Sequence, residues 1–206
     1  MPILDFNEEM TFEELCEAYI KKLRSIVEKA KEKGWKGFLR HGPSFKKITD
    51  AFIPLYARKK PRPRTDENFE LAEREFKLGK KLYYEENYRE AAERFQRAVS
   101  LVPQKHAYLG FLGLALKKIG SYDAAAKAFE KAINLYPLSK DYWVNLGECL
   151  QALGAPGKAV EAFAIAYLVE PTDLNPIRKA EALDPRISLS GKGEKRGFLK
   201  KLFGIK

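Results

Sequence analysis

Apolar residues recur at helical spacing over most of this chain, and the first run lies near its start. Its members, mostly three or four residues apart, are Leu15, Tyr19, Leu23, Ile26, Val27 and Ala30. Thr11 and Glu14 have the spacing of a capping box just before this stripe, and Gly34 follows it. The pattern therefore predicts an amphipathic helix between Thr11 and Gly34.

A second apolar stripe follows the turn-rich stretch 34–43. It consists of Phe45, Ile48, Phe52 and Ile53, and it predicts an amphipathic helix over about residues 44–56. We expect a bend at Pro54, because proline interrupts the hydrogen-bond ladder of a helix.

The middle of the chain, about residues 72–173, repeats with a period of 34 residues. Leu78-Gly79 returns as Leu112-Gly113 and again as Leu146-Gly147. The same step relates Leu82, Leu116 and Leu150; Ala91, Ala125 and Ala159; Phe95, Phe129 and Phe163; Ala98, Ala132 and Ala166; and Pro103, Pro137 and Pro171. One slot departs from the pattern, since it holds Trp143 in the third repeat but Leu109 and Glu75 in the others.

Each recurring residue type has a physical role in a pair of packed helices. The small glycines and alanines allow two helices to approach closely, and the phenylalanines fill the space between one pair and the next. The prolines end the second helix of each pair, because proline cannot continue a helical ladder. The segment 173–183, with Leu174, Ile177, Ala180 and Leu183 at helical spacing, predicts a last helix that covers the end of the stack.

The 34-residue pattern resembles that of the tetratricopeptide repeat family over about half of the chain. The resemblance implies an all-α fold, a helical-hairpin solenoid of three repeats with a concave face and a C-terminal capping helix. We expect an N-terminal helical region at 1–57, a basic proline-rich linker at 58–68, the repeat domain at 69–184 and a basic amphipathic tail at 185–206. The N-terminal helices either dock on the first repeat as a hairpin or form a separate unit.

In the family that the pattern resembles, partners bind in the groove lined by the first helix of each repeat. Carried over to this chain, the groove positions are Phe76, Lys80, Tyr83, Tyr84, Leu114, Lys117, Lys118, Val144, Asn145 and Glu148, with Gly110, Asp141 and Gln151 beside them. These residues would suit an extended peptide with an apolar side chain near the tyrosines and acidic residues near the lysines. The alternative is that the lysines form a solvated face and the tyrosines pack on the N-terminal helices.

Two narrower resemblances bear on the partner. Co-chaperones of this family grip the C-terminal carboxylate of heat-shock chaperones with Lys, Asn and Arg at five positions, which here are Phe76, Lys80, Phe111, Asp141 and Asn145. Only Lys80 retains the charge, so we expect no such clamp. The repeat number and helical additions are similar to those of type III secretion translocator chaperones, as are the stretches 108–113 and 146–154, although the basic tail departs from that pattern.

The chain offers little for catalysis. His41 and His106 lie in different segments without other metal-binding residues at suitable spacing, and no phosphate-binding or nucleophile motif is present. Cys16 and Cys149 fall within apolar helical patterns, which favours buried, reduced thiols in the cytoplasm. No run of about eighteen apolar residues and no secretory signal is apparent. We therefore expect a protein-binding adaptor or chaperone, not an enzyme, with no cofactor and no metal site.

The net charge of +10 belongs mainly to the linker and the tail. The tail ends in GKGEKRGFLKKLFGIK, where a helix would oppose Phe198, Leu199, Leu202 and Phe203 to Lys200 and Lys201, after Lys195 and Arg196. This composition is typical of a peripheral anchor on an anionic membrane surface. The alternatives are a solvated end, a helix that folds back on the body, or contact with an acidic protein or non-specifically with nucleic acid.

The membrane interpretation predicts that the tail alone carries the affinity for lipid. Vesicles with anionic lipid should sediment the full chain at low salt and release it as salt rises, because each lysine near the surface contributes about 1 kcal/mol. A chain that lacks residues 191–206 should stay in the supernatant. Equal sedimentation of the two chains would end the membrane interpretation.

Overall fold

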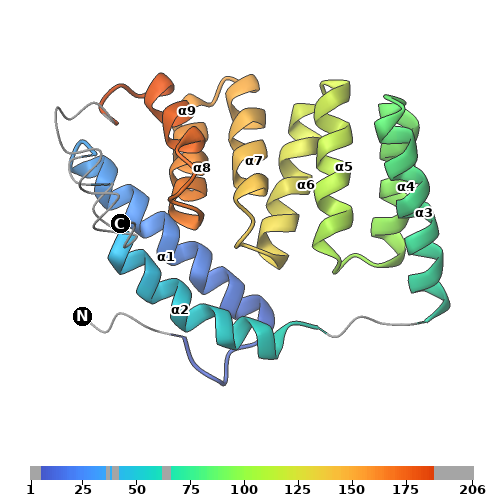
Figure 1. The fold of residues 1–206 in the computed structure, drawn as a ribbon, viewed down its shortest axis with the longest axis horizontal. Helices are drawn as coiled ribbons and strands as arrows, with labels where there is room; N and C mark the ends of the chain where they lie inside the picture. The colour runs from blue at the N-terminus through green and yellow to red at the C-terminus, as the bar shows by residue number, and fades with distance from the viewer. Residues whose placement is uncertain (1–5, 36–37, 39–41, 62–65, 188–206) are drawn as a thin grey trace.

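Nine α-helices and no strand make up the part of the chain that the computed structural model describes, residues 6–35, 38, 42–61 and 66–187 (Figure 1). The expected all-α helical-hairpin solenoid is confirmed. Three consecutive helix pairs stand side by side, and a last helix closes the row. The bounds are α1 Phe12–Glu32, α2 Gly42–Lys59, α3 Glu67–Tyr84, α4 Tyr88–Leu101, α5 His106–Ile119, α6 Tyr122–Leu135, α7 Lys140–Ala152, α8 Pro156–Val169 and α9 Asn175–Leu183.

Capping residues and prolines mark the ends of several helices. The Thr11 hydroxyl accepts a hydrogen bond from the Glu14 amide at 3.2 Å, and the Glu14 carboxylate accepts one from the Thr11 amide at 2.8 Å, so the predicted capping box is present. The second helices of the three pairs, α4, α6 and α8, end two residues before Pro103, Pro137 and Pro171, respectively. No helix within the described ranges is long and apolar enough to cross a lipid bilayer.

The connection between α2 and α3 is shorter than the expected linker 58–68. Arg58 and Lys59 continue α2 past Pro54, and both bind Glu8, the first through its carboxylate at 2.7 Å and the second through its carbonyl oxygen at 2.6 Å. At the other end the Asp66 side chain accepts a hydrogen bond from the Phe69 amide at 3.0 Å, so α3 begins at Glu67.

A glycine of the first helix and a phenylalanine of the second lock each repeat together. A Cβ added at Gly79, Gly113 or Gly147 would lie 2.6–2.8 Å from the ring of Phe95, Phe129 or Phe163, respectively. All three rings are fully buried. Phe95 also lies 5.5 Å, between ring centroids, from Phe111 of the next pair, so the ring packs both within its repeat and toward its successor.

The first repeat lacks a predecessor, and its sequence is adapted to that. Leu78 is 38% exposed, whereas its counterparts Leu112 and Leu146, covered by the preceding pair, are 6% and 4% exposed. Glu75 occupies the slot that Leu109 and Trp143 fill elsewhere, and it pairs with Arg94 at 3.3 Å. The irregular slot therefore places an ion pair at the end of the row, where an apolar residue would have met water.

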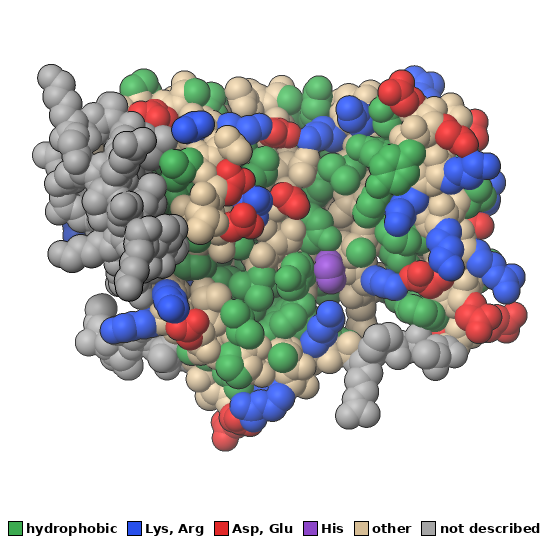
Figure 2. Space-filling view, in the orientation of Figure 1, with side chains coloured by type: hydrophobic (Ala, Val, Ile, Leu, Met, Phe, Trp, Pro, Cys, Tyr) green, Lys and Arg blue, Asp and Glu red, His purple; other side chains and the backbone are tan. Residues whose placement is uncertain are grey.

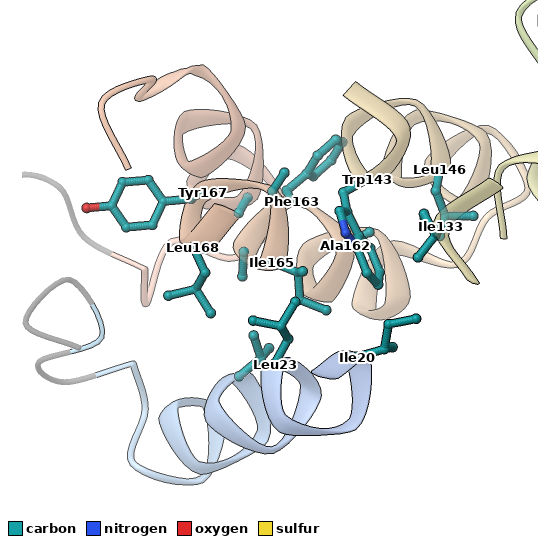
Figure 3. Close-up of a cluster of buried hydrophobic side chains, with 14 of the residues drawn as sticks. Ile20, Leu23, Ile133, Trp143, Leu146, Ala162, Phe163, Ile165, Tyr167 and Leu168 are labelled. Atoms are coloured by element: carbon teal, nitrogen blue, oxygen red, sulfur yellow. The ribbon is translucent and has the colours of Figure 1, made fainter. Parts of the chain in front are cut away.

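The N-terminal helices form a hairpin, but it does not dock on the first repeat. Helix α1 lies across α6 and α8, the second helices of the second and third repeats. Figure 3 shows Leu23 of α1 facing Ile165 of α8, with Ile20 below Trp143. The expectation of docking on the first repeat, and its alternative of a separate unit, are both wrong.

Helix α8 explains the choice of docking position. At three outward positions α4 carries Gln96, Arg97 and Ser100, and α6 carries Glu130, Lys131 and Asn134. In α8 the same positions hold Ala164, Ile165 and Leu168, which are buried. At these three positions only the third repeat is apolar, so α8 offers a surface that suits the apolar stripe of α1.

Polar and aromatic contacts fasten the rest of the hairpin. The Trp35 indole donates to the Asp184 carboxylate at 3.1 Å, and Phe38 lies 6.2 Å from Tyr167 between ring centroids. On the other side, the Tyr56 hydroxyl donates to the Leu135 carbonyl at 3.1 Å. The hairpin is thus held at the end of α6 and beyond α9, as well as along α8.

The glycine–phenylalanine contact predicts an unusual result for a conservative substitution. Gly147→Ala should lower stability by about 1–3 kcal/mol, because the buried Phe163 ring has no room to withdraw from the added methyl group. The better helix propensity of alanine, worth about 1 kcal/mol, offsets only part of this. Urea unfolding measures the effect.

The matched control is Gly157→Ala in the neighbouring helix, where an added Cβ meets nothing within 4 Å. That substitution should leave stability unchanged or raise it. Equal effects of the two substitutions would contradict the packing role of Gly147.

The docking of α1 predicts that a chain beginning at residue 61 self-associates through its uncovered α8 surface. Ala164→Glu, Ile165→Lys and Leu168→Asn together copy the second repeat onto the third, and they should restore a monomer in the shortened chain. Light scattering after size-exclusion chromatography distinguishes the two forms. A shortened chain that is monomeric without the substitutions would show that this surface does not need its cover.

Candidate functional site

The repeat row has a concave side, formed by α3, α5, α7 and α9. Helices α3 and α5, and likewise α5 and α7, contact one another more than the second helices of neighbouring repeats do, so the row curves toward its first helices. Because α1 lies on the opposite side, across α6 and α8, the N-terminal hairpin does not occupy the concave face.

All ten predicted groove residues lie on the first helices and retain some exposure. Tyr84 and Lys118 are exposed, whereas the others are half-buried: Phe76, Lys80, Tyr83, Leu114, Lys117, Val144, Asn145 and Glu148. The structure brings eight of them together in two groups, one at the α3–α5 end and one at the α7–α9 end. The other two, Leu114 and Val144, pack against the main hydrophobic core.

The group at the α3–α5 end is a cluster of aromatic rings, which we call the aromatic cluster: Phe76, Tyr83, Tyr84, Tyr88 and Phe111. Phe76 and Phe111 meet edge to face at 5.2 Å, and Tyr83 lies 6.3 Å from Phe111 and 5.8 Å from Tyr84, all between centroids. Figure 2 shows hydrophobic side chains gathered between α3 and α5, with basic side chains around them. Tyr84 is 71% exposed, so the cluster presents an open edge to solvent.

Two lysines lie on the aromatic cluster. The Lys80 ammonium is 5.6 Å from the centroid of the Phe76 ring and 5.8 Å from that of Phe111. The Lys118 ammonium is 5.6 Å from the centroid of Tyr88. Among the described residues, neither lysine has a carboxylate within ion-pair distance. The two ammonium groups are therefore stabilised by cation–π contacts, and their charge remains available to a ligand.

The α7–α9 end is occupied by an ion network. Glu148 accepts a hydrogen bond from Lys117 at 2.7 Å and another from Lys179 of α9. Lys117 also donates to the side-chain oxygen of Asn145, whose amide nitrogen donates to the Asp141 carbonyl at 2.8 Å. The predicted lysine cluster is thus divided, because Lys117 is bound within the protein while Lys80 and Lys118 are not.

Glu148 stays ionised in this network. Burial opposes its ionisation, but the hydrogen bonds from Lys117 and Lys179 outweigh burial and hold its pKa below the ordinary value of a glutamate. Three residues of this face lie outside the predicted groove. Tyr88 begins α4, the second helix of the first repeat, and Phe111 stands at one of the clamp positions. Lys179 becomes a groove residue because α9 takes the place of a fourth first helix.

A second hollow lies on the other side of the repeats, beneath α1. It has a volume of about 330 Å³ and is lined by Ile20, Arg24, Glu130, Ile133, Asn134, Trp143 and Leu146. The Trp143 indole donates to the Pro137 carbonyl at 3.0 Å, so it has no free donor for a ligand. The hollow offers an apolar floor with a charged rim but no convergent polar groups.

Burial favours the uncharged forms of Cys16, Cys149 and His106. Burial raises the pKa of Cys149 to about 11 and that of Cys16 to about 12, so both thiols are protonated near neutral pH. Burial, with Lys60 and Lys105 nearby, lowers the pKa of His106 to about 4. In the described ranges no three His, Cys, Asp or Glu side chains converge as a metal site would require.

The predicted tail site lies outside the described residues. It comprises Lys195, Arg196, Phe198, Leu199, Lys200, Lys201, Leu202 and Phe203. Its role at a membrane or with an acidic partner stays a prediction.

Comparison with known proteins matches the repeats to one family. The family model of the tetratricopeptide repeat matches residues 76–116 and 112–176. A search of curated proteins found no match. Many solved structures are similar to this one.

Three of these structures illustrate the range of the similarity. MamA is 25% identical with a TM-score of 0.55, and the match covers 85% of this chain and 89% of MamA. The second repeat domain of human RPAP3, in complex with an HSP70 peptide, is 22% identical with a TM-score of 0.54, over 56% of this chain and 97% of that domain. The Yersinia enterocolitica type III secretion chaperone SycD, in complex with a peptide of the translocator YopD, is 19% identical with a TM-score of 0.50, over 56% and 90%. The match to MamA extends beyond the repeats.

Proposed function

This chain is a tetratricopeptide repeat protein, and we propose that it acts as an interaction adaptor that binds a peptide segment of another protein on its concave face. The repeat domain, with its capping helix, would be the binding unit. The N-terminal hairpin would serve as a brace on the outer side.

The observation that carries this proposal is the position of the N-terminal hairpin. An apolar hairpin on the concave face would have competed with any ligand, but α1 is bound to α8 instead. The aromatic cluster is therefore left with an open edge, where Tyr84 is 71% exposed. Exposed aromatic side chains in a concave surface are common anchors for protein partners.

Related folds bind peptides on repeat domains of this size. The human RPAP3 domain was solved with an HSP70 peptide and SycD with a YopD peptide. The resemblance supports peptide binding by this chain, in either an adaptor or a chaperone role. It does not extend to the heat-shock carboxylate clamp, because Phe76 and Phe111 stand at two clamp positions and belong to the aromatic cluster.

The proposal predicts that partner binding requires the concave face. Tyr84→Ala combined with Lys80→Glu should lose the proteins that the wild-type chain captures from its own cells, because one change removes the exposed ring and the other reverses a free charge. Crosslinking followed by mass spectrometry identifies the captured proteins and the residues that they touch.

The matched control is Gln96→Ala combined with Arg97→Glu on the outer surface of α4, where both side chains are exposed. It makes the same types of substitution and should retain every partner. Thermal unfolding of both variants must remain close to that of the wild type. Identical capture by the two variants would contradict binding on the concave face.

A further inference from the structure

The two ends of the concave face differ in how their charges are satisfied. Resting on the proposed function, we infer that the ligand is an acidic segment with an aromatic or large aliphatic side chain, bound at the α3–α5 end, and that Glu148 excludes ligand carboxylates from the α7–α9 end. The ligand would therefore contact about half of the concave face, and Glu148 would exclude its carboxylates from the other half.

The α3–α5 end has the chemistry for an apolar anchor. The aromatic cluster is packed on its inner side by the Phe76–Phe111 contact and is open at Tyr84. A ring or a leucine side chain placed against Tyr83 and Tyr84 would lose its own contact with water and cover theirs. Because the rings already brace one another, binding there costs little reorganisation.

The charge at this end selects an acidic segment. Lys80 and Lys118 lie on ring faces and have no carboxylate partner among the described residues. A ligand carboxylate beside the rings would gain this attraction without breaking an existing ion pair. A basic segment would face two uncompensated like charges, so we expect it to be rejected.

The α7–α9 end is different because its cations already have a carboxylate. Glu148 lies between Lys117 and Lys179 and accepts hydrogen bonds from both. A ligand carboxylate would have to displace it or lie beside it, and the exposed Asp141 adds a second negative charge on the same helix. Glu148 thus occupies, within the chain, the position that a ligand carboxylate would otherwise take.

The inference can be tested with four labelled peptides that have blocked ends and equal length. The first carries one phenylalanine between glutamates. In the others the glutamates are replaced by glutamines, or by lysines, or the phenylalanine is replaced by alanine. Fluorescence anisotropy with the full chain should rank the glutamate–phenylalanine peptide first, and its binding should weaken as salt rises.

Three substitutions in the full chain locate the contacts. Lys80→Gln and Lys118→Gln should each weaken the glutamate–phenylalanine peptide about threefold, as expected for partly exposed ion pairs. Glu148→Gln should strengthen it about fivefold, because two lysines lose their internal partner and the local charge becomes more positive. This gain of binding is not expected from a substitution that merely loosens the fold.

Outer-face controls separate these effects from the change in net charge. Glu130→Gln and Lys131→Gln on α6 alter the total charge equally, on exposed positions away from the concave face, and both should leave binding unchanged. Weaker binding by Glu148→Gln, or equal effects of Glu148→Gln and Glu130→Gln, would overturn the role of Glu148.

The failure of this inference differs from the failure of the proposed function. If the glutamine or lysine peptide binds as well as the glutamate peptide, or if none binds while capture of cellular partners still requires Tyr84 and Lys80, the acidic ligand class is wrong and the adaptor function stands. If partner capture and peptide binding both ignore Tyr84 and Lys80, both proposals fail.

Discussion

The contact between a glycine on one helix and a phenylalanine ring on the next is the interaction on which the rest of the structure depends. It recurs as Gly79 with Phe95, Gly113 with Phe129 and Gly147 with Phe163, each too close to admit a Cβ without movement. Because the three contacts are equivalent, the three helix pairs adopt the same internal geometry. Equivalent pairs that stack in sequence form a regular row, and the row curves toward its first helices.

That curvature gives the row an outer side and a concave side, which differ in the interactions that their residues make. On the outer side α8 is apolar where α4 and α6 are polar, and the N-terminal hairpin covers it. Ion pairs lie toward both ends of the row, with Glu75 and Arg94 at the open end of the first repeat, and with Lys117, Glu148 and Lys179 on the concave side beside the capping helix. The hydrophobic effect therefore stabilises the brace, while ion pairs shape the candidate binding face.

The division of the lysines gives the candidate site its character. Residues that look alike in the sequence, Lys117 and Lys118, have opposite situations, since one is bound by Glu148 and Asn145 and the other lies on the Tyr88 ring. A single step along the helix is enough to separate them, because consecutive residues point about 100° apart. The number of basic residues in the groove is thus a poor measure of the charge that a ligand would meet.

The sequence by itself determined the helices, the three repeats and the capping helix, because periodic spacing, capping residues and prolines act over short distances along the chain. It also determined which residues lie on the first helices, although their role in binding stays a prediction. Only the tertiary structure decided that the hairpin binds α8, that Phe111 completes an aromatic cluster, and that Lys179 reaches Glu148. These contacts depend on which surfaces meet in space. The sequence carried a signal only for the docking of the hairpin, in the comparison of repeats, where Ala164, Ile165 and Leu168 replace polar residues. An amphipathic stripe specifies that a helix must be covered, whereas the shape and polarity of a distant surface specify what covers it.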